Sequence, residues 1–313
     1  MEDYPKTLNE LENRFHTDDA CRAYLYSLRW PNGFVCPRCG QTKAWQMSSA
    51  VYWCTSCSYK ASVTAGTIFE RTRKPLTVWF RVIWWITIQK YGASAKGLQR
   101  MLGLGSYETA WTWLHKLRRA MVRQGRDRLS GIIEVDETFI GGEKHGGKRG
   151  RGASGKALVL IAAQKDGNRL GRIRLYCIPN ASAEHIESAV EEAIEPGSIV
   201  RTDGWGGYNH LAGLGYEHLV VREDAAVGEN LLPACNVVAS LLKRWLGGTL
   251  QGAVSHEHLE YYLDEYTFRF NRRTSQYRGK LFYRLLQQAV ITDVTTYHGI
   301  KLGLRGKRSS NKL

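Results

Sequence analysis

The sequence predicts a multidomain protein: a small cysteine-rich module, a helical region and an α/β domain built on a mixed sheet. Three observations lead to this fold class. Four cysteines are grouped before residue 60, apolar residues recur at helical spacing between residues 75 and 121, and strand and helix patterns alternate from residue 131. The 313 residues suffice for two or three such domains. No run approaches the ~20 apolar residues of a membrane-spanning helix, so we expect no membrane association.

The positive charge of the chain is concentrated in one segment. The formal net charge is +15 and the sequence pI is about 9.6. Residues 21–130 carry +15, whereas residues 1–20 carry −4, residues 131–280 carry −1 and residues 281–313 carry +5. A basic segment beside a nearly neutral one predicts that the first binds a polyanion and that the second has another task. The simpler alternative is a soluble protein that is merely basic.

The cysteine-rich module has the spacing of a zinc ribbon. Two CxxC pairs, separated by fourteen residues, supply the expected ligands Cys36, Cys39, Cys54 and Cys57. Four thiolates on two tight turns suit the tetrahedral coordination of Zn²⁺, and because all four positions are filled, we expect a structural zinc. Gly40 follows the first pair, and Ser58 takes the equivalent place after the second. We expect N-terminal helices and this ribbon to form residues 1–62.

Residues 72–126 are expected to contain a helix-turn-helix. A first helix is predicted over Ser94–Leu102, and Ser106 can cap a second helix after a glycine-containing turn. The second helix ends in the basic run Lys116–Arg119, as a DNA-reading helix would. An ordinary helical hairpin with a solvated polar face is the alternative, and the basic composition of the surrounding segment favours DNA binding.

Residues 131–292 are expected to form a five-stranded mixed sheet with helices on both faces. The expected strands are 132–140, 157–164, 170–178, 198–202 and 218–222. The expected helices are 183–194, 236–245, 256–270 and 279–291. Asp166-Gly167 is a hairpin turn between the second and third strands. This element order is that of an RNase H-like domain, and residues 293–313 follow it as a basic tail.

One glycine-rich segment is similar to a nucleotide-binding loop. Residues 150–156 nearly match a P-loop, but Ala157 replaces the hydroxyl residue that would hold magnesium, and the segment leads into a strand instead of a helix. We therefore expect no nucleotide site. The basic residues of 144–156, together with those of 301–312, are expected to contact DNA phosphates without sequence preference.

Two carboxylates stand where a metal site could form. Asp136 lies in the middle of a predicted strand, where Glu134 shares its face and Glu137 points the other way. Asp203 ends another predicted strand and is followed by Gly204. If these strands are neighbours, the two carboxylates can share Mg²⁺ or Mn²⁺, which supports phosphodiester chemistry. The alternative is that the two aspartates are unrelated.

Several motifs in order resemble one known family. They are Arg29-Trp30-Pro31 before the first CxxC pair, Thr64-Ala65-Gly66-Thr67, Leu102-Gly103-Leu104-Gly105-Ser106-Tyr107, Glu134-Val135-Asp136-Glu137, Thr202-Asp203-Gly204-Trp205, Ser240-Leu241-Leu242-Lys243-Arg244-Trp245, Tyr262-Leu263-Asp264-Glu265 and Phe268-Arg269-Phe270-Asn271-Arg272-Arg273. Over roughly residues 15–291 the chain resembles the DDE-type insertion-sequence transposases with an N-terminal zinc ribbon and an ISXO-type catalytic domain.

The resemblance implies an RNase H-like catalytic domain in which Asp136 and Asp203 are the first two ligands of Mg²⁺ or Mn²⁺. In this family the third ligand stands seven residues before a lysine and varies among Glu, His and Asn. Counting back from Lys243 gives Asn236, which would coordinate through its amide oxygen, while Lys243 would contact phosphate near the scissile bond. The nearest acidic alternative upstream is Glu229.

The resemblance also implies a function. We expect a bacterial, cytoplasmic and nucleoid-associated transposase that binds the terminal inverted repeats of its element and target DNA as a homo-oligomer. It would catalyse metal-dependent 3′-end cleavage and strand transfer. An alternative is a noncatalytic zinc-ribbon and helix-turn-helix DNA-binding protein, such as an inactive or domesticated copy, for which Asn236 is the support. A structure-selective nuclease of the same fold is a third possibility.

Overall fold

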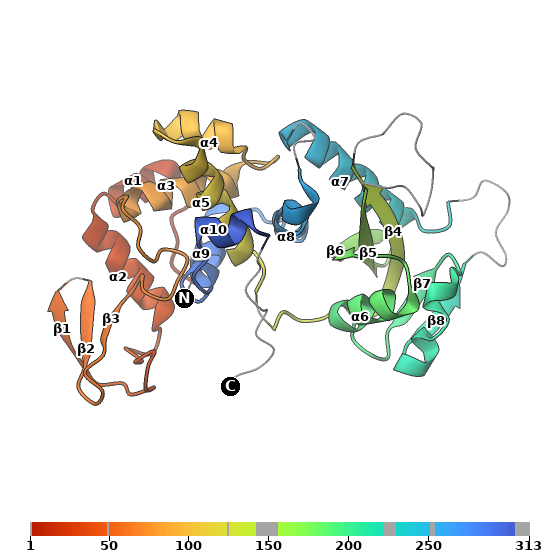
Figure 1. The fold of residues 1–313 in the computed structure, drawn as a ribbon, viewed down its shortest axis with the longest axis horizontal. Helices are drawn as coiled ribbons and strands as arrows, with labels where there is room; N and C mark the ends of the chain where they lie inside the picture. The colour runs from red at the N-terminus through yellow and green to blue at the C-terminus, as the bar shows by residue number, and fades with distance from the viewer. Residues whose placement is uncertain are drawn as a thin grey trace. The chain divides into compact units, whose positions relative to one another are not determined.

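The computed structural model describes residues 2–48, 50–123, 125–141, 156–221, 230–250 and 254–303. The chain forms two compact units (Figure 1): unit 1 contains Met1–Gln124 and Ser275–Leu313, and unit 2 contains Gly125–Thr274. Three parts of the chain named in the sequence predictions lie outside the described residues. They are residues 144–155, Glu229 and the tail from residue 304. Among the described helices, none combines the length and the apolar character needed to cross a bilayer.

Unit 1 is built around the apolar helix α3 (Leu76–Ile88), most of whose side chains are buried. Helices α1 (Leu8–Arg14) and α2 (Asp18–Arg29) precede it, and each begins at a threonine whose hydroxyl accepts a backbone N–H of the first turn. Helix α9 (Arg278–Ala289) returns from the far end of the sequence to pack against α2, α3 and α5.

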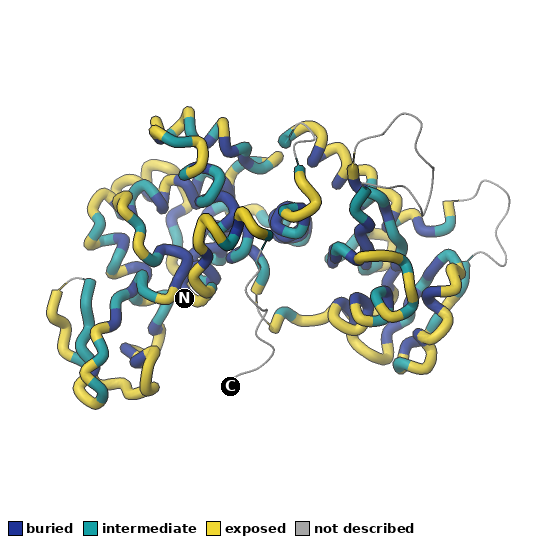
Figure 2. The backbone as a smooth tube through the Cα atoms, in the orientation of Figure 1, coloured by how far each residue is buried: buried dark blue, intermediate teal, exposed yellow. Residues whose placement is uncertain are grey.

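The zinc-ribbon part of unit 1 is a three-stranded antiparallel sheet. Its strands are β1 (Ala44–Ser48), β2 (Val51–Cys54) and β3 (Lys60–Ser62), with β2 in the centre. Aromatic side chains hold one face of the sheet, because the Tyr52 ring lies against the rings of Tyr26, Trp30 and Phe34. The edge strand β1 is exposed along four of its five residues, as its yellow tube shows (Figure 2).

The two helices of the predicted helix-turn-helix are α4 (Ala95–Leu102) and α5 (Tyr107–Ala120). Serine side chains cap both: the Ser94 hydroxyl accepts the Gly97 N–H at 3.0 Å, and the Ser106 hydroxyl accepts the Glu108 N–H at 3.1 Å. Gly103 ends α4 at φ 59°, a left-handed conformation that favours glycine. A short helix, α10 (Tyr297–Lys301), packs against α5 within the stretch expected to be a tail.

Unit 2 contains the predicted five-stranded mixed sheet. The strands are β4 (Ile132–Ile140), β5 (Ala157–Asp166), β6 (Arg169–Ile178), β7 (Ile199–Thr202) and β8 (Glu217–Val220). Their order is β6-β5-β4-β7-β8; β4, β5 and β6 pair antiparallel, whereas β4, β7 and β8 pair parallel. This order and direction are those of an RNase H-like domain, so the predicted fold class is confirmed.

Helices cover both faces of this sheet. On one face, α6 (Ala183–Ala193) packs over β5 and β6, and the short helices η1 (Gly206–Tyr208) and η2 (Leu211–Leu214) complete the layer. On the other face, α7 (Pro233–Leu250) packs over β4 and β5, and α8 (Leu259–Phe270), preceded by η3 (His256–His258), packs over β6. Alternate residues of β4, β5 and β6 therefore enter two separate cores.

The compact units divide the chain differently from the expected boundaries. The catalytic domain was expected to extend through residue 292, but unit 2 ends at Thr274. The difference is helix α9, because its buried face, including Phe282, contacts the aromatic rings of Phe80 and Trp84 in unit 1. The apolar pattern of α9 is compatible with either core, and only the tertiary contacts assign it.

Candidate functional site

The four cysteines form a compact thiol cluster. Their Sγ atoms all lie within 4.8 Å of one another. The Cys36 and Cys57 sulfurs are 3.6 Å apart, and so are those of Cys39 and Cys54. A tetrahedral zinc with Zn–S bonds of about 2.3 Å needs sulfurs about 3.8 Å apart, so this cluster fits a structural zinc ion.

Two equivalent turns present these cysteines. The Gly40 N–H donates to the Cys36 carbonyl at 2.9 Å, and the Ser58 N–H donates to the Cys54 carbonyl at 3.0 Å. Gly40 (φ 76°) and Ser58 (φ 58°) both adopt the left-handed conformation, so Ser58 has the same backbone role as the glycine. Backbone N–H groups of Cys57 and Ser56 point at the Cys54 sulfur and lower its pKa to about 6, which favours the thiolate that zinc binds.

The sheet places Asp136 on β4 and Asp203 directly after the end of β7, the parallel neighbour of β4. β4 and β7 are parallel partners, with Glu134 opposite Arg201. Asp136 and Asp203 each lie two residues farther along, toward the same carboxyl end. Asp136 pairs with Ile161, which belongs to the core beneath α7, so Asp136 lies on the α7 face. Neighbouring strands are about 4.8 Å apart, which is close enough for two carboxylates to share one cation.

A tight turn after β7 holds Asp203. The Trp205 N–H donates to the Asp203 Oδ1 at 3.0 Å, and the Gly204 N–H donates to the Thr202 hydroxyl at 3.3 Å. Gly204 has φ 78°, and a Cβ at this position would lie 2.6 Å from Cγ1 of Val220 on β8. The turn therefore requires glycine for both its conformation and its packing.

Glu134 connects this sheet to helix α7. It is fully buried, and its Oε2 accepts the N–H groups of Ala234 at 2.7 Å and Cys235 at 3.4 Å, in the first turn of α7. Within the described part of the chain its Oε1 accepts no hydrogen bond, but it lies 3.8 Å from both the Lys165 Nζ and the Arg201 Nη1. The helix N-terminus and two cations thus compensate the buried charge.

Asn236 and Lys243 both lie on α7 and are exposed. Asn236 directly follows Ala234 and Cys235, whose N–H groups donate to Glu134. The Asn236 Nδ2 donates to Oδ1 of Asn230 at 2.6 Å. Seven residues, close to two helical turns, separate it from Lys243, so the two side chains share one side of the helix. Within the described ranges, no group of three or more His, Cys, Asp or Glu side chains other than the cysteine cluster is close enough to share an ion.

Comparison with known proteins matches both parts of the chain. A model of the ISXO2-like transposase domain matches residues 128–271, and a model of the transposase zinc-ribbon domain matches residues 16–60. Together these matches cover more than half of the chain. The chain thus contains an ISXO2-like transposase domain and a transposase zinc-ribbon domain. The zinc-ribbon match of this transposase contains all four clustered cysteines, and the domain match ends three residues before unit 2 does.

A relative of this transposase occurs in Halobacterium salinarum. It is described as an uncharacterized protein in transposable element ISH50. The two sequences are 26% identical over 296 residues, which span 87% of this chain and 94% of the relative. The similarity therefore extends over the ribbon, the helices and the α/β domain together.

Glu134 of the transposase was expected only to share a face with Asp136. The sequence contains one sign of a larger role, because Glu134 is a carboxylate between the apolar residues Ile133 and Val135 of a strand buried on both faces. Its acceptor role toward α7 could not be read from the sequence, since its partners Ala234 and Cys235 lie one hundred residues farther along.

Proposed function

We propose that this transposase binds the two ends of its insertion sequence, cleaves the 3′ end of each transferred strand and joins it to target DNA. The observation that carries the proposal is the parallel pairing of β4 with β7, which supports a shared role for Asp136 and Asp203 at one end of the sheet. Carboxylates in this arrangement suit a divalent cation in phosphodiester chemistry.

The proposed DNA-binding part is the zinc ribbon with helices α4 and α5, acting on terminal inverted repeats. The net charge of +15 over residues 21–130 supports this assignment, because cationic side chains release counterions from DNA when they bind phosphates. We propose that Zn²⁺ held by the four cysteines keeps the ribbon folded. Two ends must be cut and joined together, so the active form is proposed to be a homo-oligomer on DNA.

The proposed catalytic groups are Asp136, Asp203, Asn236 and Lys243. The first three offer oxygen ligands, which Mg²⁺ and Mn²⁺ prefer. A divalent cation there would favour ionisation of the attacking water and stabilise the leaving oxygen. Lys243 would hold the phosphate beside these groups through its ammonium.

The proposed reaction has two displacements at phosphorus. In the first, a water oxygen bonds to phosphorus, the bond from phosphorus to the 3′ oxygen of the element breaks, and that oxygen takes up a proton. In the second, the resulting 3′-OH bonds to a phosphorus of target DNA, loses its proton and displaces the 3′ oxygen of the target strand. No high-energy cofactor is needed, because each step exchanges one phosphate ester bond or hydrolyses it.

The test combines purified protein, a duplex carrying the element's own terminal sequence and Mn²⁺ or Mg²⁺. We expect cleavage and strand transfer by the wild type and a loss of on the order of a thousandfold or more in Asp136→Asn and Asp203→Asn, since an amide removes the charge that binds the cation. Retained cleavage in either variant would refute the catalytic assignment. Unchanged activity of Asn236→Ala would show that another residue is the third ligand.

A second candidate is a noncatalytic DNA-binding protein, favoured by an amide instead of a carboxylate at position 236. In the same assay this candidate predicts zinc-dependent binding of the duplex by the wild type and no cleavage with either metal. Binding without cleavage would therefore replace the transposition proposal with this one.

A further inference from the structure

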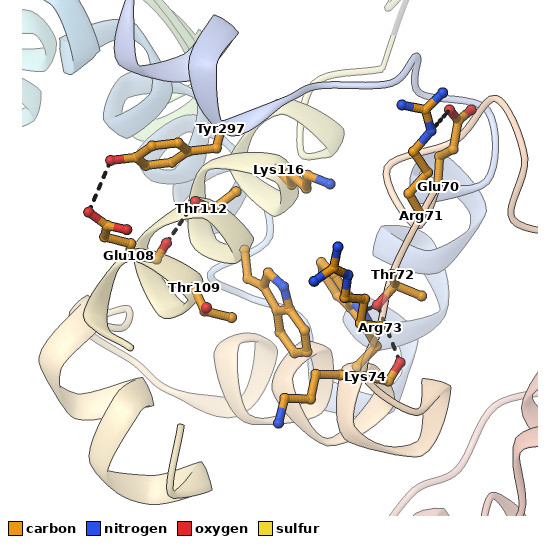
Figure 3. A pocket seen from close by; sticks show the side chains of 12 residues that line it. Glu70, Arg71, Thr72, Arg73, Lys74, Glu108, Thr109, Thr112, Lys116 and Tyr297 are labelled. Atoms are coloured by element: carbon orange, nitrogen blue, oxygen red, sulfur yellow. Dashed lines mark hydrogen bonds and ion pairs between the residues drawn. The ribbon is translucent and has the colours of Figure 1, made fainter. Parts of the chain in front are cut away.

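A basic groove lies in unit 1 between helix α5 and the loop that precedes α3 (Figure 3). Its volume is about 380 Å³. We call it the α5 groove and define it by its polar lining: Arg71, Thr72, Arg73 and Lys74 of the loop, and Thr109, Thr112 and Lys116 of α5. Two carboxylates, Glu70 and Glu108, also line it.

The α5 groove is lined by more basic than acidic side chains. Glu70 accepts the Gly66 N–H at 2.8 Å and pairs with Arg71 at 3.5 Å, and Glu108 accepts the Tyr297 hydroxyl at 3.3 Å. Arg73 and Lys74 are exposed, and in the described part of the chain neither has a carboxylate within ion-pair distance. The groove therefore presents positive charge that an anionic ligand could neutralise.

The loop is rigidly supported despite its exposure. The Thr72 hydroxyl accepts the Trp79 indole N–H at 2.8 Å and donates to the Lys74 carbonyl at 3.3 Å. Beneath it, the Trp79 and Trp113 rings stack with centroids 3.9 Å apart. Arg71 adopts φ 56°, a left-handed conformation that is unfavourable for a residue other than glycine. An arginine thus occupies a position where glycine would be less strained, while its side chain is 92% exposed.

One side of α5 faces the loop. Thr109, Thr112 and Lys116 are three and four residues apart, so they line one stripe of the helix. The Lys116 ammonium donates to the Ile68 carbonyl at 3.2 Å, which fixes it at the base of the loop. Figure 3 shows Lys116 and Arg73 pointing into the space between the two elements, whereas Arg71 and Lys74 extend in different directions along it.

We propose that the α5 groove holds the sugar–phosphate backbone of one strand of duplex DNA, with Arg71, Arg73 and Lys74 as the phosphate contacts. The cations are spread along the groove instead of converging on one point, which suits a chain of phosphates better than a single anion. The Thr72 and Thr112 hydroxyls already donate to the carbonyls of Lys74 and Glu108, so the cations carry the proposed phosphate contacts. This inference rests on the DNA binding in the proposed function. It adds that the α5 groove is the surface that would orient α5 on DNA.

The test measures DNA affinity against salt concentration for the full chain with bound zinc. The variants are Arg71→Gly, Arg73→Ala, Lys74→Ala and the triple variant, and the probes are a duplex with the element's end and an unrelated duplex of equal length. Each lost phosphate contact should reduce the slope of log K against log salt by about 0.9. The triple variant should therefore lose about two to three units of slope and weaken on both duplexes by the same factor.

Arg81→Ala is the matched control, because Arg81 is an exposed cation of α3 paired with Glu12 and lies outside the groove. It should leave the slope nearly unchanged. Arg71→Gly also separates charge from folding: it relieves the left-handed strain, so the melting temperature should not fall while DNA affinity does.

Three results would overturn the inference. One is an unchanged slope in the triple variant while the wild type binds DNA. Another is weakening of the element's duplex alone. The third is a rise in wild-type melting temperature with inorganic phosphate that the triple variant lacks, together with an unchanged DNA slope, since this would make the groove a small-anion site. If the wild type binds neither duplex, the proposed function fails as well, and the two failures are thereby distinguished.

Discussion

At the residue scale, Glu134 joins two parts of unit 2 that carry different candidate catalytic groups. Its carboxylate is fully buried in β4, two residues before Asp136, and it accepts N–H groups from the turn of α7 that precedes Asn236. A buried carboxylate is tolerated only where donors and opposite charges surround it. Here the α7 amides and the cations of Lys165 and Arg201 meet that requirement.

Replacing Glu134 should therefore weaken the contact between β4 and the first turn of α7. We expect Glu134→Gln to lower the free energy of unfolding by about 2–4 kcal/mol, because the neutral amide leaves two nearby cations uncompensated. Urea unfolding measures this loss, and hydrogen exchange should show faster exchange of the Ala234 and Cys235 amides. The control Glu187→Gln, which breaks a surface pair with His210, should cost less than about 1 kcal/mol. Equal stability and equal amide protection in Glu134→Gln would contradict this role.

At the element scale, the turn after β7 determines where Asp203 lies. The strand ends at Thr202, and Gly204, in a left-handed conformation, lies against the side chain of Val220. The neighbouring strand β8 reinforces the turn, because the Thr202 hydroxyl and the His218 Nε2 are 2.8 Å apart. Burial lowers the pKa of His218, which keeps the imidazole neutral in this contact at neutral pH.

Gly204→Ala tests this turn. The added Cβ is strained by φ 78° and meets Val220 Cγ1 at 2.6 Å, so we expect a loss of about 2–4 kcal/mol in the free energy of unfolding. Gly206→Ala, two residues away, has no neighbour closer than 4.0 Å and should be nearly neutral. Chemical denaturation of the two variants gives the comparison, and a Gly204→Ala protein as stable as Gly206→Ala would rule out the packing argument.

At the scale of the whole molecule, the chain leaves unit 1 at residue 124, forms unit 2 and returns to unit 1 at Ser275. Helix α9 completes the first core, in which the rings of Phe15, Phe80 and Phe282 contact one another. Unit 1 therefore depends on the last part of the chain, and the thiol cluster belongs to the same unit as α9.

A substitution in the core of one unit should destabilise that unit and leave the other unit unaffected. Phe282→Ala is expected to cost unit 1 about 3–5 kcal/mol, as aromatic-to-alanine changes in a core do. Leu263→Ala, in the buried face of α8, should cost unit 2 about 2–5 kcal/mol. In calorimetry, the transition lowered by Phe282→Ala should be the one that a zinc chelator also lowers, and Leu263→Ala should lower the other. A chelator effect on the Leu263→Ala transition instead would contradict the division into these units.

The sequence by itself determined the local parts: the two cysteine turns, the Ser106 cap of α5, the approximate positions of the five strands along the chain, and the places of Asp136 within a strand and Asp203 at the end of one. These follow from spacing and periodicity within a few residues, which short-range geometry controls. Tertiary structure alone decided which core receives α9, which helix Glu134 holds and that the loop at Arg71 faces α5. An apolar or charged pattern in the sequence predicts that a helix face must be buried or that a charge must be compensated. Only the packing of segments that are distant in the sequence decides which residues bury or compensate it.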